Sequence, residues 1–482
     1  MPSRCTLFFL AIALLALLTG PAQAIVWDWG PLASRIDDVT GADRLEALGP
    51  LYESATATNG MRFRAVRPFY GRFYDPGTGR EYRDYLWPVG TAKRERDGYH
   101  WRFLLTFYHD FDTTDPRSRY RFWSLPLYFQ GRDINRDRYA AVFPLGGNIK
   151  EFLGRDDIRF VLFPLWMRSS INDVVTTDYL WPIVSTTHGK GIERFRIFPF
   201  YGRNVHRDLY DKRFVLWPIW NWAKYKKPGS SGTGYILFPL WGHVKLEDQE
   251  TWFILPPFIR FTHGARLNYN YCPWPFVQWS SGQVEKLYLW PLWGHKASHG
   301  VRSGFFLWPF FSTETMDRGR EVGQRFNALP FIFSEIRTAR PPPDLPKQRG
   351  EVVYRYHKLW PLMSYLRDGD RLRFRMLDLW FLKDTAPMER CWCPLWTVYA
   401  HRRSGVKTED ELLWGLWRHE REGGAYRHAS LFPLFSWTRD DRAGPSREWN
   451  VLKGLAGCRQ EGAQKRYRVL YFFRFGGKEE RP

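Results

Sequence analysis

One short phrase recurs along nearly the whole chain: a proline flanked on both sides by aromatic and aliphatic residues. The segment 288–295, Y-L-W-P-L-W-G-H, is a clear copy. Its central Pro291 has counterparts at Pro68, Pro88, Pro126, Pro144, Pro164, Pro182, Pro199, Pro218, Pro239, Pro257, Pro275, Pro309, Pro330, Pro361, Pro394 and Pro433. Between positions 50 and 182 the central residues are separated by alternating steps of 18 and 20 residues, with Thr106 in one proline position. Self-similarity of this kind indicates a repeat protein, which can reach 482 residues without separate domains.

Each repeat is predicted to form β-structure. A proline at the centre of nearly every copy excludes a helix, because proline lacks an amide donor and clashes with the preceding helical turn. In the segment 194–203, two arginines at even positions alternate with Phe195 and Ile197, which is the period of a strand. Polar segments such as 189–191 and 227–232 separate the repeats and are typical of hairpin connections. We therefore expect an all-β antiparallel meander of about 22 strands, one strand to each aromatic-proline-aromatic repeat of 18 to 20 residues.

A meander of this size has two edges whose backbone groups must be paired or protected. The solution that we expect first is closure into a large β-barrel of the outer membrane, whose strands need about 9 to 11 residues. The prolines favour an alternative, a soluble β-repeat array such as a propeller or solenoid, because each unpaired ladder position is costly in lipid. In that alternative the aromatic-proline step is a corner between two short strands. A third possibility is an open sheet that wraps around a partner.

The last part of the chain carries an alternating aromatic pattern. The apolar positions are Tyr467, Val469, Tyr471, Phe473 and Phe475, and arginines fall between them. This stretch of nine residues resembles the C-terminal assembly signal of bacterial outer-membrane β-barrel proteins, although here 476–482 follow it. The resemblance implies a β-barrel fold and an outer-membrane location.

The N-terminus predicts export. An apolar run over 7–18, preceded by Arg4 and followed by A-Q-A at 22–24, is typical of a cleaved signal peptide. The predicted divisions are the signal peptide 1–24, an N-terminal preamble 25–47 that is partly helical over 31–47, β-repeats over 48–336, a proline-rich loop 337–350, degenerate repeats of the same domain over 351–475, and a C-terminal tail 476–482.

The sequence contains no recognisable catalytic motif. H-E-x-x-H, G-x-S-x-G, a Walker-type glycine loop and a calcium loop are all missing, so we expect no enzyme activity, no catalytic residue and no cofactor. The cysteines after the signal peptide are Cys272, Cys391, Cys393 and Cys458. Cys391 and Cys393 are predicted on one side of a strand, but a metal site needs more ligands at suitable spacing. We therefore expect no metal site, and four cysteines are too few for a disulfide framework.

The charge balance is basic, with 71 lysines and arginines against 50 acidic residues. Export excludes nucleic acid, the usual partner of so basic a chain. Nine arginines on or beside predicted strands are expected to face anions: Arg194, Arg196, Arg213, Arg371, Arg373, Arg375, Arg466, Arg468 and Arg474. In a barrel they would line the lumen and favour anionic solutes. In a soluble array, arginines beside the 25 tryptophans would suit acidic glycans or lipopolysaccharide phosphates.

Two functions from different classes follow. The first is a non-enzymatic outer-membrane β-barrel with a basic interior, acting as a passive pore or as a structural or export component, with outer-membrane lipid or lipopolysaccharide as its partner. The second is a periplasmic or surface-exposed β-repeat protein that binds anionic envelope polymers or protein partners. The first would need detergent for extraction, whereas the second would leave the cell in a soluble fraction.

Overall fold

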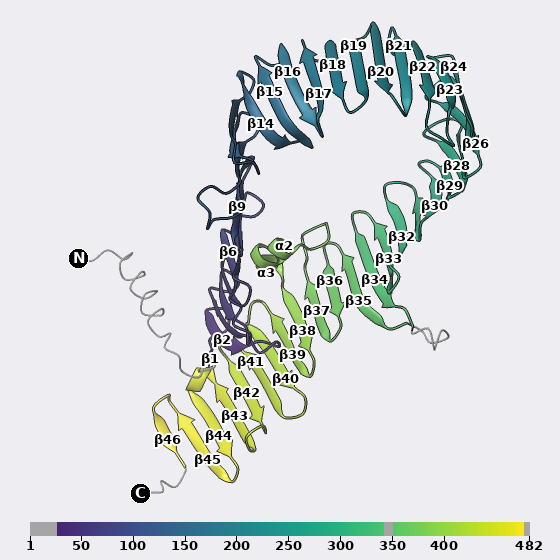
Figure 1. The fold of residues 1–482 in the computed structure, drawn as a ribbon. Helices are drawn as coiled ribbons and strands as arrows, with labels where there is room; N and C mark the ends of the chain where they lie inside the picture. Colours follow the sequence, from purple (N-terminus) through teal and green to yellow (C-terminus); the bar gives the residue numbers. More distant parts are fainter. Residues whose placement is uncertain (1–26, 342–349, 477–482) are drawn as a thin grey trace. The chain divides into compact units, whose positions relative to one another are not determined.

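The computed structural model describes residues 27–341 and 350–476. Strands make up 61% of the described residues and helices 3%, so the prediction of an all-β protein is confirmed. The chain divides into two compact units, the first formed by the described residues of 1–77, 370–378 and 385–482 and the second by those of 78–369 and 379–384. Within each unit, strands that follow one another along the chain pair in antiparallel fashion, which confirms the predicted meander (Figure 1). Among the helices of the described ranges, none is long and apolar enough to cross a membrane.

The first unit contains β1 (Trp27–Asp28), β2 (Ala33–Asp37), β3 (Asp43–Ala47), β4 (Tyr52–Thr56), β5 (Arg62–Val66), β6 (Tyr70–Asp75), β37 (Arg371–Met376), α2 (Ala386–Cys391), α3 (Cys393–Trp396), β38 (Tyr399–Ser404), β39 (Lys407–Leu412), β40 (Trp417–Glu422), β41 (Tyr426–Leu431), β42 (Phe435–Asp440), β43 (Ser446–Val451), the 3-10 helix η1 (Leu452–Gly454), β44 (Ala456–Glu461), β45 (Gln464–Val469) and β46 (Phe473–Phe475).

The second unit contains β7 (Arg80–Tyr85), β8 (Gly90–Glu95), β9 (Gly98–Phe103), β10 (Thr106–Asp110), β11 (Tyr120–Ser124), β12 (Tyr128–Arg132), β13 (Arg138–Val142), β14 (Gly146–Phe152), β15 (Arg155–Val161), β16 (Trp166–Ile171), β17 (Val174–Tyr179), β18 (Val184–Gly189), β19 (Ile192–Ile197), β20 (Tyr201–His206), β21 (Tyr210–Val215), β22 (Trp220–Tyr225), β23 (Gly232–Leu237), β24 (Trp241–Leu246), β25 (Gln249–Ile254), β26 (Ile259–Gly264), β27 (Leu267–Tyr271), β28 (Val277–Gly282), β29 (Val284–Leu289), β30 (Trp293–Ser298), β31 (Val301–Phe306), β32 (Phe311–Asp317), β33 (Glu321–Ala328), β34 (Ile332–Ala339), β35 (Val352–Leu359) and β36 (Met363–Asp368).

The repeat prolines lie in turns between strands. Strand β29 ends at Leu289 and β30 begins at Trp293, with the cis peptide bond Trp290–Pro291 between them, and every other cis X–Pro bond of the described residues also falls between two strands. In a turn, the missing N–H of proline leaves no gap in the ladder. The expectation of one long strand per repeat is therefore wrong. Each repeat forms two strands, mostly of five to eight residues, and the described residues hold 46 strands where the sequence predicted about 22.

Proline turns and polar turns lie at opposite edges of the meander. Because each strand reverses direction, every second turn falls at the same edge. From β7 to β36, all the proline turns fall at one edge, which we call the proline edge, and the turn at Leu104 and Leu105 takes the place of one of them. The other connections, such as 172–173 and 299–300, are mostly polar and fall at the polar edge.

One face of the second unit's sheet is more buried than the other, and we call it the buried face. Over β12 to β15 it carries a hydrophobic cluster that includes Phe129, Ile149 and Phe160. Cross-strand partners lie on the same face of a sheet. On the buried face, the strands after β15 carry small polar side chains, among them Ser185 and Thr251, which are both 3% exposed. Small side chains leave room on this face for the pocket described below.

In the first unit, β1 and β3 of the ladder β1–β6 pack against β39–β41 of the ladder β37–β46 (Figure 1). Two sequence predictions fail here. The preamble over 31–47 is not helical: β2 and β3 form a hairpin in which Ser34, Ile36 and Arg44 are buried. Apolar residues spaced three or four apart in so short a segment fit a strand pair as well as a helix. The backbone pairing of β2 with β3 determines which of the two forms.

The segment predicted as degenerate repeats around 381 and 394 also differs from the prediction. Residues 386–396 form the short helices α2 and α3, each with a proline in its first turn, where its missing N–H is tolerated. Cys391 and Cys393 are buried on these helices, and the strand predicted for them is wrong. Within the described part of the chain, Cys272 and Cys458 form no disulfide bond.

The aromatic pattern at the end of the chain forms a hairpin, so the single final strand predicted there is wrong. Tyr467 and Val469 lie on β45 and pair with Phe475 and Phe473 on β46, while Tyr471 lies in the turn with a positive φ of 64°.

Closure of the sheet into a barrel is not confirmed. In the described ranges β1 pairs with β2 and β46 pairs with β45, and no ladder joins β1 to β46. The predicted signal peptide 1–24 and the tail beyond 476 lie outside the described residues. So do residues 342–349 of the predicted loop 337–350, which begins within β34.

Candidate anion-binding pocket

A pocket of about 450 Å³ opens on the second unit between β19 and β24. The strand register determines which side chains reach it. Arg194 of β19 pairs with Asn204 of β20, which pairs in turn with Lys212 of β21, so these three side chains form one row on the buried face. Arg196 belongs to the neighbouring row on the same face. The pocket therefore has three cationic side chains on one face of the sheet.

These cations have no carboxylate partner among the described residues. In the part of the chain that the structure describes, no ion pair joins Arg194, Arg196 or Lys212 to an acid. The one acidic side chain on this face from β17 to β24 is Asp178, two strands away from Arg196. The Nε atom of Arg196 is buried without a hydrogen-bond partner, and so is Oδ1 of Asn204. Buried polar groups are normally paired, so the pocket offers unused donors and an unused acceptor to a ligand.

Aromatic and apolar groups complete the pocket. The Lys212 ammonium lies 4.6 Å from the ring centre of Tyr210 and 5.2 Å from that of Tyr225, which holds the cation by cation–π attraction. Gly202 lies in the same row as Arg196, and the ring of Phe214 covers the space that a Cβ atom would occupy there. Farther along, small and aliphatic residues of β22 to β24 form an apolar end. The pocket thus suits an anion that also carries an apolar or ring-shaped part.

The structure brings two of the nine predicted arginines, Arg194 and Arg196, together on the face that forms this pocket. Arg213 borders the same pocket from the opposite face, where it pairs with Asp211 at 2.9 Å and lies 5.1 Å from the ring centre of Trp222. This ion pair lowers the pKa of Asp211, and Asp211 neutralises Arg213.

The other predicted arginines lie in the first unit and do not join the pocket. Arg371 is exposed on β37, and Arg466, Arg468 and Arg474 are exposed on β45 and β46. Arg373 and Arg375 line a second cavity of about 490 Å³, which also receives the arginines 44, 67, 390 and 402 and the glutamates 46, 53, 389 and 411.

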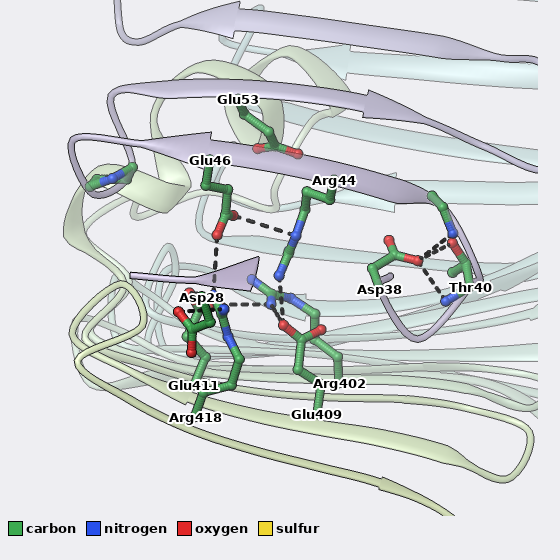
Figure 2. Close-up of polar contacts among 12 residues, drawn as sticks. Asp28, Asp38, Thr40, Arg44, Glu46, Glu53, Arg402, Glu409, Glu411 and Arg418 are labelled. Atoms are coloured by element: carbon green, nitrogen blue, oxygen red, sulfur yellow. Dashed lines mark hydrogen bonds and ion pairs between the residues drawn. The ribbon is translucent and has the colours of Figure 1, made fainter. Parts of the chain in front are cut away.

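The arginines of that cavity are balanced by carboxylates. Arginines and glutamates of β3 and of the strands β38 to β40 form a buried cluster of ion pairs (Figure 2). Arg44, whose side chain is 7% exposed, donates to Glu409 at 2.6 Å. Arg402 donates to Glu409 at 3.1 Å and to Glu411 at 2.8 Å. Burial alone would raise the pKa of Glu411, but three neighbouring guanidinium groups lower it to about 2. The carboxylate is therefore ionised and held by its partners.

Arg418 of β40 is the most buried member of this cluster, because none of its side-chain surface is exposed. It lies 3.3 Å from Glu46, 3.4 Å from Glu411 and 3.5 Å from Asp28, and so ties β40 to both β1 and β3 (Figure 2). Arg67 likewise pairs with Glu53, and Arg373 pairs with Glu389. Because its cations already have acidic partners, we interpret this cluster as a structural contact that holds the two ladders of the first unit together.

Sequence reasoning missed Asn204, Lys212 and Gly202 of the pocket. Lys212 could have been noticed, because it is a basic residue within an alternating strand pattern like that of Arg194. Placing the two side chains on the same face needs the hairpin register, which was not predicted. No protein-family model matches the chain, and comparison with curated proteins finds no match. The site must therefore be interpreted from its own geometry.

Proposed function

We propose that this chain is an exported, non-enzymatic β-repeat protein that binds anionic polymers of the cell envelope. The observation that carries the proposal is a group of three cations on one face of the β19–β24 pocket, Arg194, Arg196 and Lys212, that have no carboxylate partner in the described ranges. Guanidinium groups bind carboxylate and phosphate in a bidentate manner. Aromatic rings and amides beside them suit the faces and hydroxyls of sugars, so acidic glycans and lipopolysaccharide phosphates are the ligand class we favour.

The pore function is supported less well. A membrane-spanning strand needs about 9 to 11 residues, whereas the strands of the second unit have five to eight. Washing a membrane fraction with carbonate distinguishes the two functions. Retention of the full chain after the wash, together with a heat-dependent shift in gel mobility, would support an integral barrel.

Polyanion binding can be tested by titrating the full chain with polygalacturonate, an acidic polysaccharide, and with neutral dextran. The triple variant Arg194→Gln, Arg196→Gln, Lys212→Gln removes the three cations of the pocket. Its matched control, Arg302→Gln, Arg318→Gln, Arg320→Gln, removes the same charge from exposed positions on β31 and the following β32–β33 connection. We expect the pocket variant to weaken polygalacturonate binding about tenfold or more, because hydrogen bonds to charged groups are lost, and the control to change it little.

Two results would contradict the proposal. Equal weakening by the two triple variants would mean that only the net charge of the chain attracts the polymer. Equal affinity of the wild-type chain for polygalacturonate and dextran would mean that anionic groups are not recognised at all.

A further inference from the structure

The proline edge of the second unit exposes one large apolar side chain in nearly every turn. The residue that follows the turn proline is aliphatic or aromatic, with an exposed fraction between 44% and 62%, at Leu127, Leu145, Leu165, Ile183, Phe200, Ile219, Leu240, Phe258, Phe276, Leu292, Phe310, Phe331 and Leu362. We call these side chains the apolar tips. Soluble proteins rarely leave so long a row of apolar groups in water, and such surfaces mark interaction sites.

The turns at this edge form an ordered row. The amide of Trp181 donates to the carbonyl of Pro164 in the preceding proline turn at 2.8 Å, and the amide of Trp308 donates to Pro291 at 2.7 Å. The aromatic residues before the prolines also pack on one another, as Trp290 does on Trp308 with ring centres 5.8 Å apart. Successive tips are two strands apart, or about 10 Å. The tips therefore form a regular apolar row, which fits a continuous apolar medium.

The apolar zone behind the tips has a limited depth. In the turn after β29, residues 289–293 are all apolar, and charged or polar side chains begin with Lys286 and His295. Two or three residues of a strand span about 7 to 10 Å. Amphipathic surfaces that lie on a bilayer bury their apolar side by about 5 to 10 Å, to the boundary between headgroups and acyl chains.

A band of positive charge follows the apolar zone. The second and third strand residues from each proline-edge turn of β7 to β36 include nine basic residues. Five of them have carboxylate partners: Lys358 is buried against Asp384, and Arg83, Arg159, Arg203 and Arg213 pair with Glu81, Asp157 or Asp211. The other four, Arg102, Arg168, Arg196 and Arg260, form no ion pair within the described residues. The same positions hold only two acidic residues, Asp84 and Asp178. We call this the basic band. With the tips at the level of the outer acyl chains, the band lies at the level of the lipid phosphates, where each cation near an anionic surface adds to the attraction.

We propose that the proline edge of the second unit docks on an anionic lipid surface, with the apolar tips in the outer acyl region and the basic band against the phosphates. The inference goes beyond the polymer binding proposed above, because it rests on apolar burial at the proline edge. Arg196 is the one residue of the triple charge variant that also belongs to the basic band. The two can fail separately, since the tips play no part in the β19–β24 pocket.

Flotation of the full chain with vesicles tests the docking. One set of vesicles combines phosphatidylglycerol with phosphatidylethanolamine, and the other contains phosphatidylcholine alone. The tip variant carries Leu165→Ser, Phe200→Ser, Leu240→Ser, Leu292→Ser and Phe310→Ser. Its control carries Ile134→Ser and Leu153→Ser, which remove apolar side chains that are 72% and 82% exposed at the polar edge. Circular dichroism shows whether each variant keeps its strands, which we expect because these side chains lie outside the core.

The wild-type chain and the control should float with the anionic vesicles, and the tip variant should bind them roughly tenfold more weakly or worse. Tryptophan fluorescence of the bound wild-type chain should be quenched by lipids brominated on the acyl chain. The proposal is overturned if the wild-type chain stays at the bottom of the gradient, or if the tip variant floats like the wild-type chain. It is also overturned if the chain forms oligomers in the absence of lipid and the tip substitutions dissociate them. In that case the proline edge would be an interface between copies of the chain.

Discussion

Glu420 of β40 and His428 of β41 are cross-strand partners in the first unit, and their environment keeps both side chains uncharged over the same range of pH. Burial and the nearby Glu409 raise the pKa of Glu420 to about 7. Burial lowers the pKa of His428 to about 4, and its Nδ1 lies 2.8 Å from the hydroxyl of Thr438. Between these two values neither partner carries a charge, so the strand pair should be most stable there.

The contribution of Glu420 to the stability of the first unit should fall as the pH rises toward and through 7. Its folded pKa of about 7 lies above the ordinary value of 4.5, so the folded state keeps a proton that the unfolded chain releases. The stabilisation is complete below pH 4.5, the ordinary pKa of a glutamate. It is lost once the pH exceeds about 7, the pKa of Glu420 in the folded chain. A difference of this size corresponds to roughly 3 kcal/mol. Urea unfolding of Glu420→Gln should therefore lack this decline and show higher stability than the wild-type chain under alkaline conditions.

The control for this substitution is Glu285→Gln, at an exposed position of β29 in the second unit. It should keep the wild-type pH dependence. An identical decline in Glu420→Gln and the wild-type chain would show that the carboxyl group ionises without cost.

His428 should make the first unit sensitive to acid. Its folded pKa of about 4 lies below the ordinary value of 6.5, so the unfolded chain binds the proton more readily. The contribution of His428 to stability should therefore decrease as the pH falls from 6.5 to about 4, by roughly 3 kcal/mol in total. His428→Asn should flatten this part of the stability curve, measured by thermal unfolding over a pH series. His299→Asn, in an exposed polar-edge turn, should leave the curve as it is.

Removing Arg418 should weaken the contact between the two ladders of the first unit. Arg418→Ala leaves Glu46 and Glu411 without one of their cationic partners in a buried site. Breaking a buried ion pair by removing one partner costs about 3 to 5 kcal/mol. Hydrogen–deuterium exchange should then become faster in both β3 and β40. Arg421→Ala removes an exposed arginine of the same strand and should change exchange very little. Unchanged protection of β3 in Arg418→Ala would show that the ladders are held by other contacts.

The sequence predicts the all-β class and the meander because proline spacing and strand alternation are local signals. It does not decide whether a period near 19 residues holds one long strand or two short ones, since both place alternating side chains around the proline. The choice depends on the conformation of the Trp290–Pro291 turn and its equivalents, which composition does not specify. The expectation of a corner at this step, held as the alternative, is the one that the turns confirm.

The candidate site is predictable to a similar degree. Arg194 and Arg196 stand out as basic residues that alternate within a strand. Lys212 joins them only through the register of β19, β20 and β21. The buried cluster lies beyond sequence reasoning, because Arg44 and Glu409 are 365 positions apart and their contact needs the packing of two ladders. Local patterns therefore predict strands and exposed charges, whereas long-range pairing decides which charges have partners.

Gly202 offers a test of the pocket that changes no charge. An added Cβ atom at this position would meet the ring of Phe214, so Gly202→Ala should displace this ring, which lines the pocket. We expect polygalacturonate binding to weaken several-fold because the pocket becomes smaller, while the cations stay in place. Gly323→Ala on β33 is the matched control, since its nearest neighbouring atom would be 3.9 Å away. Calorimetric titration of both variants measures the effect. Wild-type affinity in Gly202→Ala, combined with a loss in the triple charge variant, would mean that the polymer contacts the cations without entering the pocket.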